Sequence, residues 1–265
     1  MFNKSLLIPS VAMAVLATLG ASQIQAQEQE QEQEWEFQAG SMLLTQSSVW
    51  EGGNNLVSLF PYFGASYGNW RFNVETPVAY QSHLTDNLSY SVALRIRDEG
   101  YNSDDFNLNS FDKDPIFEGY RTPDTEALAS LGLQYGWFSF EASRDISNQS
   151  DANSASLSVE MPVYDNEDDL SITMGISAEW YDDKYVNYYY GVAQEQVNTQ
   201  VGRTAYNGDA AINYSLSFRS AYALNESWML MADARHTLLD DNITDSPLVG
   251  SDSQSSFALM IIYQF

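Results

Sequence analysis

The sequence predicts an all-β fold, an antiparallel up-and-down barrel that crosses a membrane with its strands. Three observations indicate it. Many segments alternate between apolar and polar side chains, the chain begins with an export signal, and it ends in an alternating strand with a terminal aromatic residue. The alternating segments are about ten residues long, which is the length that a tilted strand needs to cross the hydrocarbon.

The first 26 residues are expected to be a signal peptide. Lys4 supplies a positive charge, the apolar stretch from Leu6 to Leu19 is too short for a comfortable helical span, and Ala26 is a small residue at a plausible cleavage point. A transmembrane anchor is the alternative, and the length and flanks disfavour it. Residues 27–34 are rich in Gln and Glu and are expected to form a solvated, flexible tail. The barrel is then residues 35–265.

Period-2 alternation identifies the candidate strands. Between Leu88 and Arg97, for example, every second residue is apolar and the residues between are Ser, Ala or Arg. Eleven segments are expected to be strands: Trp35–Leu44, Leu56–Tyr67, Trp70–Tyr80, Leu88–Arg97, Ala127–Tyr135, Trp137–Ile146, Ala155–Val163, Leu170–Trp180, Ala210–Leu224, Ser227–Leu238 and Ser256–Phe265. A barrel with both ends on one side of the membrane needs an even number. We therefore predict twelve strands, with ten as the alternative.

The polar face of these strands is unusually charged, which argues against a soluble β-sandwich or lipocalin-like barrel with a packed core. A wet lumen tolerates such residues, and the apolar face then points into lipid. The candidate lumen charges are Arg95, Arg97, Glu160, Glu179, Arg219, Asp233 and Arg235, to which Glu141 and Arg144 are added. Whether they pair and plug the interior or leave a narrow channel stays open at this point.

The last segment is the sharpest single signal. An apolar, mostly aromatic set alternates along it up to the final residue: Phe257, Leu259, Ile261, Tyr263 and Phe265. A terminal aromatic residue on such a strand resembles the signal read by the outer-membrane barrel assembly machinery. With the signal peptide, it predicts a Gram-negative outer-membrane location, in contact with outer-membrane lipid and lipopolysaccharide. Counting back from this strand, the long polar stretches Asp98–Glu126, Tyr181–Arg203 and Leu239–Gln254 fall on the extracellular side.

Composition and motifs point away from several kinds of chemistry. A net charge of -25 makes nucleic acid a very poor partner, and the absence of cysteine excludes disulfide and thiolate sites. His83 and His236 have acidic neighbours, and Ser246 is a conceivable nucleophile, but no nucleophile motif surrounds it. We therefore expect a protein that is not an enzyme and has no cofactor.

Two loop features have competing interpretations. One is a set of acidic residues that offers oxygen ligands to calcium or magnesium but lacks a defined ligand spacing, so a solvated loop is favoured. Its members are Asp98, Glu99, Asp104, Asp105, Asp112 and Asp114. The other is a tyrosine cluster at Tyr185, Tyr188, Tyr189 and Tyr190, interpreted as part of an interfacial girdle, a loop packed inside the lumen, or a binding epitope.

Several short pieces resemble the MipA/OmpV family of outer-membrane proteins. They are Trp50-Glu51-Gly52, Tyr189-Tyr190-Gly191-Val192, Tyr206, Asp245-Ser246-Pro247-Leu248-Val249 and the closing Tyr263-Gln264-Phe265. The chain departs from the family at Gln38-Ala39-Gly40, where the family has a glycine-rich strand, and in the acidic segment 97–121. The resemblance implies a non-enzymatic scaffold linked to peptidoglycan-remodelling enzymes, with a lytic transglycosylase and a penicillin-binding protein as partners. A narrow diffusion channel and a surface adhesin or ion-binding barrel are the alternatives.

Overall fold

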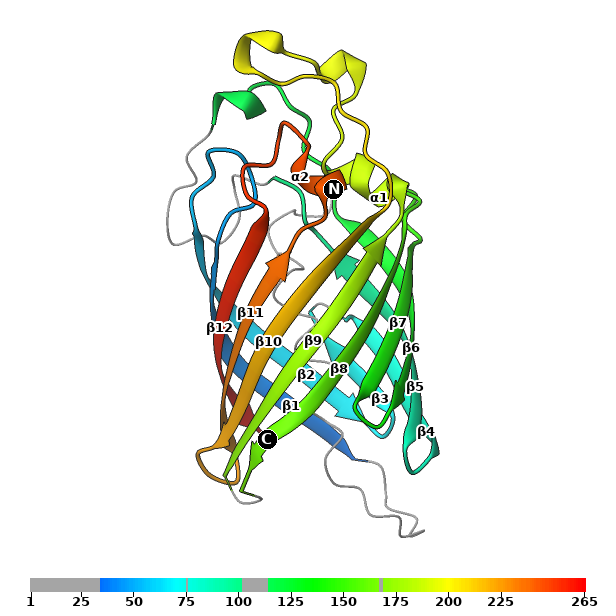
Figure 1. Cartoon of the computed structure of the whole chain (residues 1–265). Coiled ribbons are helices and arrows are strands. Elements are labelled where there is room, and N and C mark those ends of the chain that lie inside the picture. Colours follow the sequence, from blue (N-terminus) through cyan, green and yellow to red (C-terminus); the bar gives the residue numbers. More distant parts are fainter. Residues whose placement is uncertain (1–33, 75, 102–113, 167–168) are drawn as a thin grey trace.

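The protein is a closed barrel of twelve antiparallel strands in a computed structural model that describes residues 34–74, 76–101, 114–166 and 169–265. Each strand pairs with its neighbours in sequence, and the last pairs with the first (Figure 1). The strands are β1 (Trp35–Gln46), β2 (Leu56–Tyr67), β3 (Trp70–Asn73), β4 (Val78–Thr85), β5 (Leu88–Arg97), β6 (Glu126–Tyr135), β7 (Phe138–Asp145), β8 (Asn153–Asp165), β9 (Leu170–Tyr181), β10 (Ala211–Ala223), β11 (Trp228–Leu238) and β12 (Ser253–Gln264). The predicted fold class and the count of twelve are confirmed. The predicted signal peptide and most of the tail lie outside the described residues.

The odd number of eleven predicted strands came from residues 70–80. The expectation of one strand there is wrong, because the segment contains β3 and the start of β4. The Asn73 N–H donates to the Thr76 carbonyl at 3.0 Å, and the Thr76 N–H donates to the Asn73 side chain at 2.8 Å, which closes a turn. Pro77 follows and has no N–H to give to a sheet ladder. The chain therefore reverses part-way up the wall, and β4 runs on to Thr85.

The two ends of the barrel differ in the length of their connections. At the end where the C-terminus lies, the strands are joined by short turns such as Gly68-Asn69 and Asp86-Asn87 (Figure 1). The long connections 98–125, 182–210 and 239–252 all lie at the opposite end, as predicted. Outer-membrane barrels keep their long loops outside the cell, so we call these ends inner and outer.

The outward face of the wall is apolar, as lipid requires. Leu131, Leu157 and Phe218 are exposed there, and so are Phe257, Leu259 and Ile261 of the predicted assembly signal. Aromatic rings gather at the inner end, where Trp228 packs on Tyr263 at 5.0 Å between ring centroids. Rings at this depth suit the membrane interface. No helix in the described part of the chain is long and apolar enough to span a membrane.

The inward face is not polar all round, a feature that the charged positions in the sequence do not indicate. On β1, β2, β11 and β12 it carries a buried apolar patch: Met42, Leu44, Phe60, Met231, Ala258, Met260 and Ile262. The charged and hydroxyl-bearing positions belong mainly to β5–β11. Ser130 and Ser143 bond across β6 and β7 at 2.8 Å, and Ser215 and Thr237 across β10 and β11 at 2.9 Å. The lumen wall therefore has an apolar side and a polar side.

Closure of the barrel depends on a glycine in β1. Gly40 lies opposite Ile262, and a Cβ there would lie 2.1 Å from the Ile261 carbonyl oxygen. Backbone cannot move aside as a side chain does, so we expect Gly40→Ala to lower the free energy of unfolding by about 1–3 kcal/mol. Gly64→Ala in β2 is the matched control, because its Cβ would meet only the movable Tyr62 hydroxyl, at 2.9 Å. Urea unfolding in lipid vesicles measures the free energy of unfolding of both variants. Equal losses would contradict this account of the contact between β1 and β12.

Candidate functional site

Five outer connections pack together over the mouth of the barrel, and we call them the cap. The cap comprises the described residues of segments 47–55, 98–125, 146–152, 182–210 and 239–252. Its short helices are η2 (Pro115–Phe117), α1 (Asp183–Tyr189), η3 (Gln194–Gln196), η4 (Thr199–Val201) and α2 (Asp241–Thr244). Figure 1 shows α1 and α2 close to the rim and the yellow segment of η3 and η4 farthest from the membrane. The cap has apolar cores of its own, built from aromatic and aliphatic residues together.

Helix α1 turns Tyr185 and Tyr189 of the tyrosine cluster inward. Asp182 caps it by accepting from the Tyr185 N–H at 3.0 Å, which satisfies one of the free N–H groups of a helix start. Tyr185, Val186 and Tyr189 share the face toward the barrel and are 2% exposed or less. Of the three interpretations of the cluster, a loop packed into the mouth agrees with these residues.

The pieces that carried the family resemblance converge in the cap. The Trp50 ring stacks on Tyr190 with 5.3 Å between centroids, and its backbone bridges to Val249. The buried Ser246 hydroxyl donates to the Tyr190 carbonyl at 2.6 Å. Val192 pairs with Tyr206 through two backbone hydrogen bonds. Segments almost two hundred residues apart in sequence thus hold one another, and their side chains here are structural.

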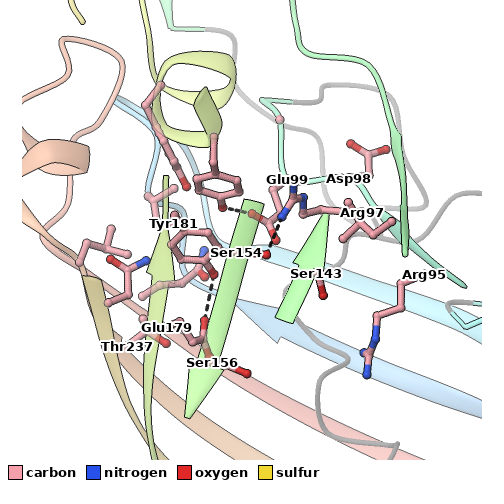
Figure 2. A pocket seen from close by; sticks show the side chains of 18 of the residues that line it. Arg95, Arg97, Asp98, Glu99, Ser143, Ser154, Ser156, Glu179, Tyr181 and Thr237 are labelled. Carbon is pink, nitrogen blue, oxygen red and sulfur yellow. Dashed lines mark hydrogen bonds between the residues drawn. The ribbon is translucent and has the colours of Figure 1, made fainter. Parts of the chain in front are cut away.

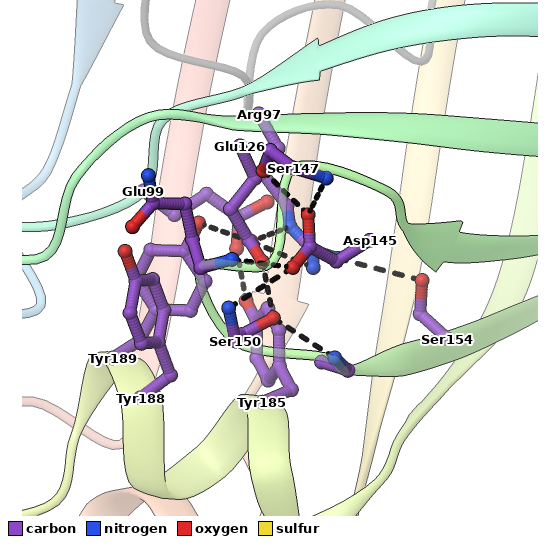
Figure 3. Close-up of polar contacts among 12 residues, drawn as sticks. Arg97, Glu99, Glu126, Asp145, Ser147, Ser150, Ser154, Tyr185, Tyr188 and Tyr189 are labelled. Atoms are coloured by element: carbon purple, nitrogen blue, oxygen red, sulfur yellow. Dashed lines mark hydrogen bonds and ion pairs between the residues drawn. The ribbon is translucent and has the colours of Figure 1, made fainter.

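A buried charge network ties α1 to the barrel wall (Figure 3). Arg97 of β5 contacts the Glu126 carboxylate of β6 through Nε and Nη2, each at 2.8 Å, and both side chains are almost fully buried. The Tyr189 hydroxyl donates to the same carboxylate at 2.6 Å, and the Ser150 hydroxyl also bonds to it. The Arg97 guanidinium lies 4.8 Å from the Tyr185 ring centroid. A guanidinium over an aromatic face is attractive, especially when water is excluded.

Glu99 is a second, half-buried carboxyl in this network. The Tyr185 hydroxyl donates to it, and burial raises its pKa, an effect that Arg97 and Tyr185 partly offset. Sequence analysis singled out Glu99 only as part of an acidic loop, and it did not identify Glu126. Glu126 is the first residue of a strand next to a polar stretch, and nothing in the local pattern indicates that it faces an arginine.

The β7–β8 connection is organised by Asp145. Its carboxylate accepts from the N–H groups of Ser147 and Gln149 at 2.8 Å and of Ser150 and Asp151 at 3.0 Å. These bonds hold the Ser150 hydroxyl against Glu126 (Figure 3). A connection that local pattern describes only as a turn therefore becomes a rigid part of the cap.

Beneath the cap, the lumen contains a cavity of roughly 250 Å3 (Figure 2). Charged groups that sequence analysis placed in the lumen line it in pairs. Arg95 contacts Glu141 at 2.5 Å, and Arg235 contacts Glu179 at 3.1 Å. Serine and threonine hydroxyls fill the positions between them, including Ser156 and Thr237. The charges of the cavity wall are thus largely compensated, and apolar side chains such as Leu56, Leu128 and Leu239 line the rest of it.

The remaining lumen charges form a second group, on neighbouring strands. Arg219 of β10 lies 3.3 Å from Glu160 of β8 and 3.6 Å from Asp233 of β11. The expectation that Arg144 also lines the interior is wrong. It is exposed and alternates in phase with the outward Phe138 and Phe140. The parity of β7 already favoured this, because Glu141 and Arg144 are three residues apart and must point to opposite faces.

The other sequence candidates that the structure describes lie apart from one another. His83 lies in β4, and His236 of β11 is exposed and bonds to the Ser255 hydroxyl at 2.8 Å. Asp98 bonds to Thr125 at 3.1 Å, and Asp114 caps η2. Within the described ranges, no group of three or more acidic or histidine side chains is arranged to hold a metal ion. Asp104, Asp105 and Asp112 lie outside those ranges.

Two cap tyrosines give a testable pH dependence. Burial raises the pKa of both Tyr120 and Tyr188 to about 12. Between the ordinary tyrosine pKa of about 10 and pH 12, the folded cap keeps protons that an opened cap would release, so its stability falls as pH rises through this window. We expect protease sensitivity of the cap to rise above about pH 10, and less steeply in Tyr120→Phe. Tyrosinate absorbance follows the ionisation of the tyrosines directly. A cap that still resists protease after all its tyrosines have ionised would contradict this pH dependence.

Comparison with known proteins agrees with this architecture. The family model described as MltA-interacting protein MipA matches residues 39–265. Outer membrane protein Omp26La of Vibrio anguillarum is 33% identical over 97 residues, which are 37% of this chain and 36% of that protein. MltA-interacting protein of Escherichia coli (strain K12) is 30% identical over 96 residues, 36% of this chain and 38% of that protein. The chain thus covers little more than a third of the length of these two relatives.

A longer match covers most of the chain. The 24 kDa outer membrane protein of Pasteurella multocida (strain Pm70) is 24% identical over 258 residues, 84% of this chain and 95% of that protein. Among solved structures, an outer membrane channel from Pseudomonas putida F1 is 10% identical with a TM-score of 0.43, covering 92% of this chain and 100% of that one. The family match covers the barrel from Ala39 in β1 to Phe265, with every converging piece of the cap, and the chain belongs to the MipA family of outer-membrane proteins.

Proposed function

We propose that this protein is a non-enzymatic interaction barrel, which holds peptidoglycan-remodelling enzymes at the inner face of the outer membrane. The observation that carries the proposal is the packed cap. Four connections meet α1 through buried side chains, so the mouth is built for closure rather than for passage of solutes. The name of the Escherichia coli relative, MltA-interacting protein, supports a lytic transglycosylase as one partner. A penicillin-binding protein is the second partner that we propose.

The surfaces that we propose for such partners are the inner-end turns. Asn87 and Glu226 are exposed side chains in two of these turns. Acidic residues predominate there, with Asp86, Asp169 and Glu226 exposed, and they would steer a basic partner surface toward this end.

Site-specific photocrosslinking in intact envelopes tests the proposal. A photoreactive residue at Asn87 or Glu226 is expected to capture a lytic transglycosylase or a penicillin-binding protein, identified by mass spectrometry. Gln200 in η4 is the matched control, because it is equally exposed but belongs to the outer end. Capture of neither enzyme at the inner positions, with barrel assembly factors still recovered, would overturn the scaffold function.

A narrow diffusion channel is the second candidate, and the charged cavity beneath the cap favours it. The two functions differ in conductance. A scaffold closed by its cap is expected to be silent in planar bilayers, whereas a channel gives discrete current steps that depend on the lumen charges. Current steps that disappear in Arg235→Gln would favour the channel function over the scaffold function.

A further inference from the structure

A second hollow, separate from the lumen cavity, lies in the cap itself. It is a groove of roughly 620 Å3 bordered by residues 120–124, the second half of α1, and segments 191–196 and 206–207. It has no lining residue in common with the cavity below. Arg121 at its edge is 84% exposed, so the groove opens to the outside of the cell.

Three tyrosine rings line the groove, and each is held by its hydroxyl. Tyr188 is fixed on both sides of its oxygen, because it accepts from the Asp124 N–H and donates to the Asp124 carbonyl, both at 2.9 Å. Tyr206 donates to the Asn242 carbonyl at 2.9 Å, and Tyr120 to the Gly191 carbonyl at 3.3 Å. The rings are therefore oriented before any ligand arrives, which lowers the entropy lost on binding.

Four carboxamides line the groove, and one of them, Asn187, is engaged by the backbone of Asp183 and Gly208. Within the described part of the chain, the side chains of Gln149, Gln196 and Asn207 make no hydrogen bond. Each offers two donors and an acceptor to a ligand. The charges nearby cancel, since Arg121 lies 3.6 Å from Asp124, and Glu195 of the lining is offset by the buried Arg203, whose guanidinium lies 5.7 Å from the centroid of the Tyr120 ring.

We propose that this groove binds a neutral saccharide, and that its occupant is the oligosaccharide of lipopolysaccharide. Fixed aromatic faces suit the apolar faces of sugar rings, and free amides suit their hydroxyls, which both donate and accept. An anionic ligand gains little from a lining without excess positive charge. A peptide would need a free sheet edge or deep apolar pockets, and the apolar lining beyond the rings is limited to Pro123, Val192 and Ala193. Lipopolysaccharide sugars surround the outer end of every outer-membrane barrel, so this occupant is always at hand.

Calorimetric titration of the full chain in nanodiscs tests the proposal. The probe is a neutral oligosaccharide from the outer part of lipopolysaccharide, freed of lipid A and of the charged inner sugars. We expect saturable binding, weakened at least tenfold in the triple variant Gln149→Ala, Gln196→Ala and Asn207→Ala. The matched control is Gln194→Ala with Gln200→Ala, two exposed glutamines of the same segment that lie outside the groove. The control is expected to bind as the wild type does.

Three results would overturn the proposal. The first is that the folded wild type fails to bind the oligosaccharide. The second is that the triple variant and the control lose affinity equally. The third is that the groove binds an unfolded protein, such as reduced casein, and no saccharide. Dextran is included as a second saccharide. Binding of dextran as tight as that of the oligosaccharide would overturn the assignment to lipopolysaccharide.

Discussion

Arg97→Ala is expected to lower the free energy of unfolding by about 3–5 kcal/mol. The substitution leaves the Glu126 carboxylate, which has no exposed side-chain surface, without its counter-charge. Tyr189 and Ser150 still donate to it, but neutral donors do not replace a cation that contacts it through two nitrogens. Because Arg97 also lies over the Tyr185 ring, the variant is expected to loosen α1 and expose the cap to protease.

Arg121→Ala is the matched control for this prediction. Its ion pair with Asp124 has a similar composition, but the two side chains are 84% and 45% exposed. Such pairs contribute between about 0 and 1 kcal/mol. Urea unfolding in lipid vesicles compares the two variants with the wild type. A loss for Arg97→Ala no larger than for Arg121→Ala would show that the buried network does not hold the cap.

Leu131→Arg is expected to destabilise the folded barrel by about 2–4 kcal/mol, because it places a charge at the middle of the lipid-facing wall. Leu131 lies near the centre of β6, opposite the equally exposed Val92 of β5. Tyr135→Arg on the same strand and face is the matched control. Position 135 is at the inner end, where the cost falls to about 0–1 kcal/mol.

The same vesicle unfolding assay measures both lipid-face variants. Equal and small effects at positions 131 and 135 would falsify the assignment of this face to the membrane. A soluble barrel of the same topology would tolerate arginine at either exposed position, so the dependence on depth separates the two environments.

Sequence pattern predicted the wall well, because each strand carries its own signal. Strands such as β2 and β5 are bounded as alternation indicates, since lipid on one side selects every second residue. The error at residues 70–80 has a local cause. Alternation continues across the turn, and only Thr76-Pro77 marked the break. The inward apolar patch also escaped prediction, because Met260 and Ile262 alternate with residues that are apolar as well.

The cap could not be predicted in the same way, since its contacts link distant segments. The Tyr189–Glu126 bond spans 63 residues, and Trp50 stacks on a tyrosine 140 positions later. Neither partner indicates the other through local pattern or spacing. The family resemblance identified many of the residues that meet in the cap, but their arrangement appears only in the folded chain.

Direct binding between the purified components tests the proposed scaffold most directly. The barrel in nanodiscs is immobilised, and a purified lytic transglycosylase is titrated against it, with an unrelated outer-membrane barrel as the control. Saturable binding to this barrel alone, weakened when Asp86 and Glu226 are both replaced by Lys, is the result that the account predicts. Absence of binding between a folded barrel and an active enzyme would contradict it.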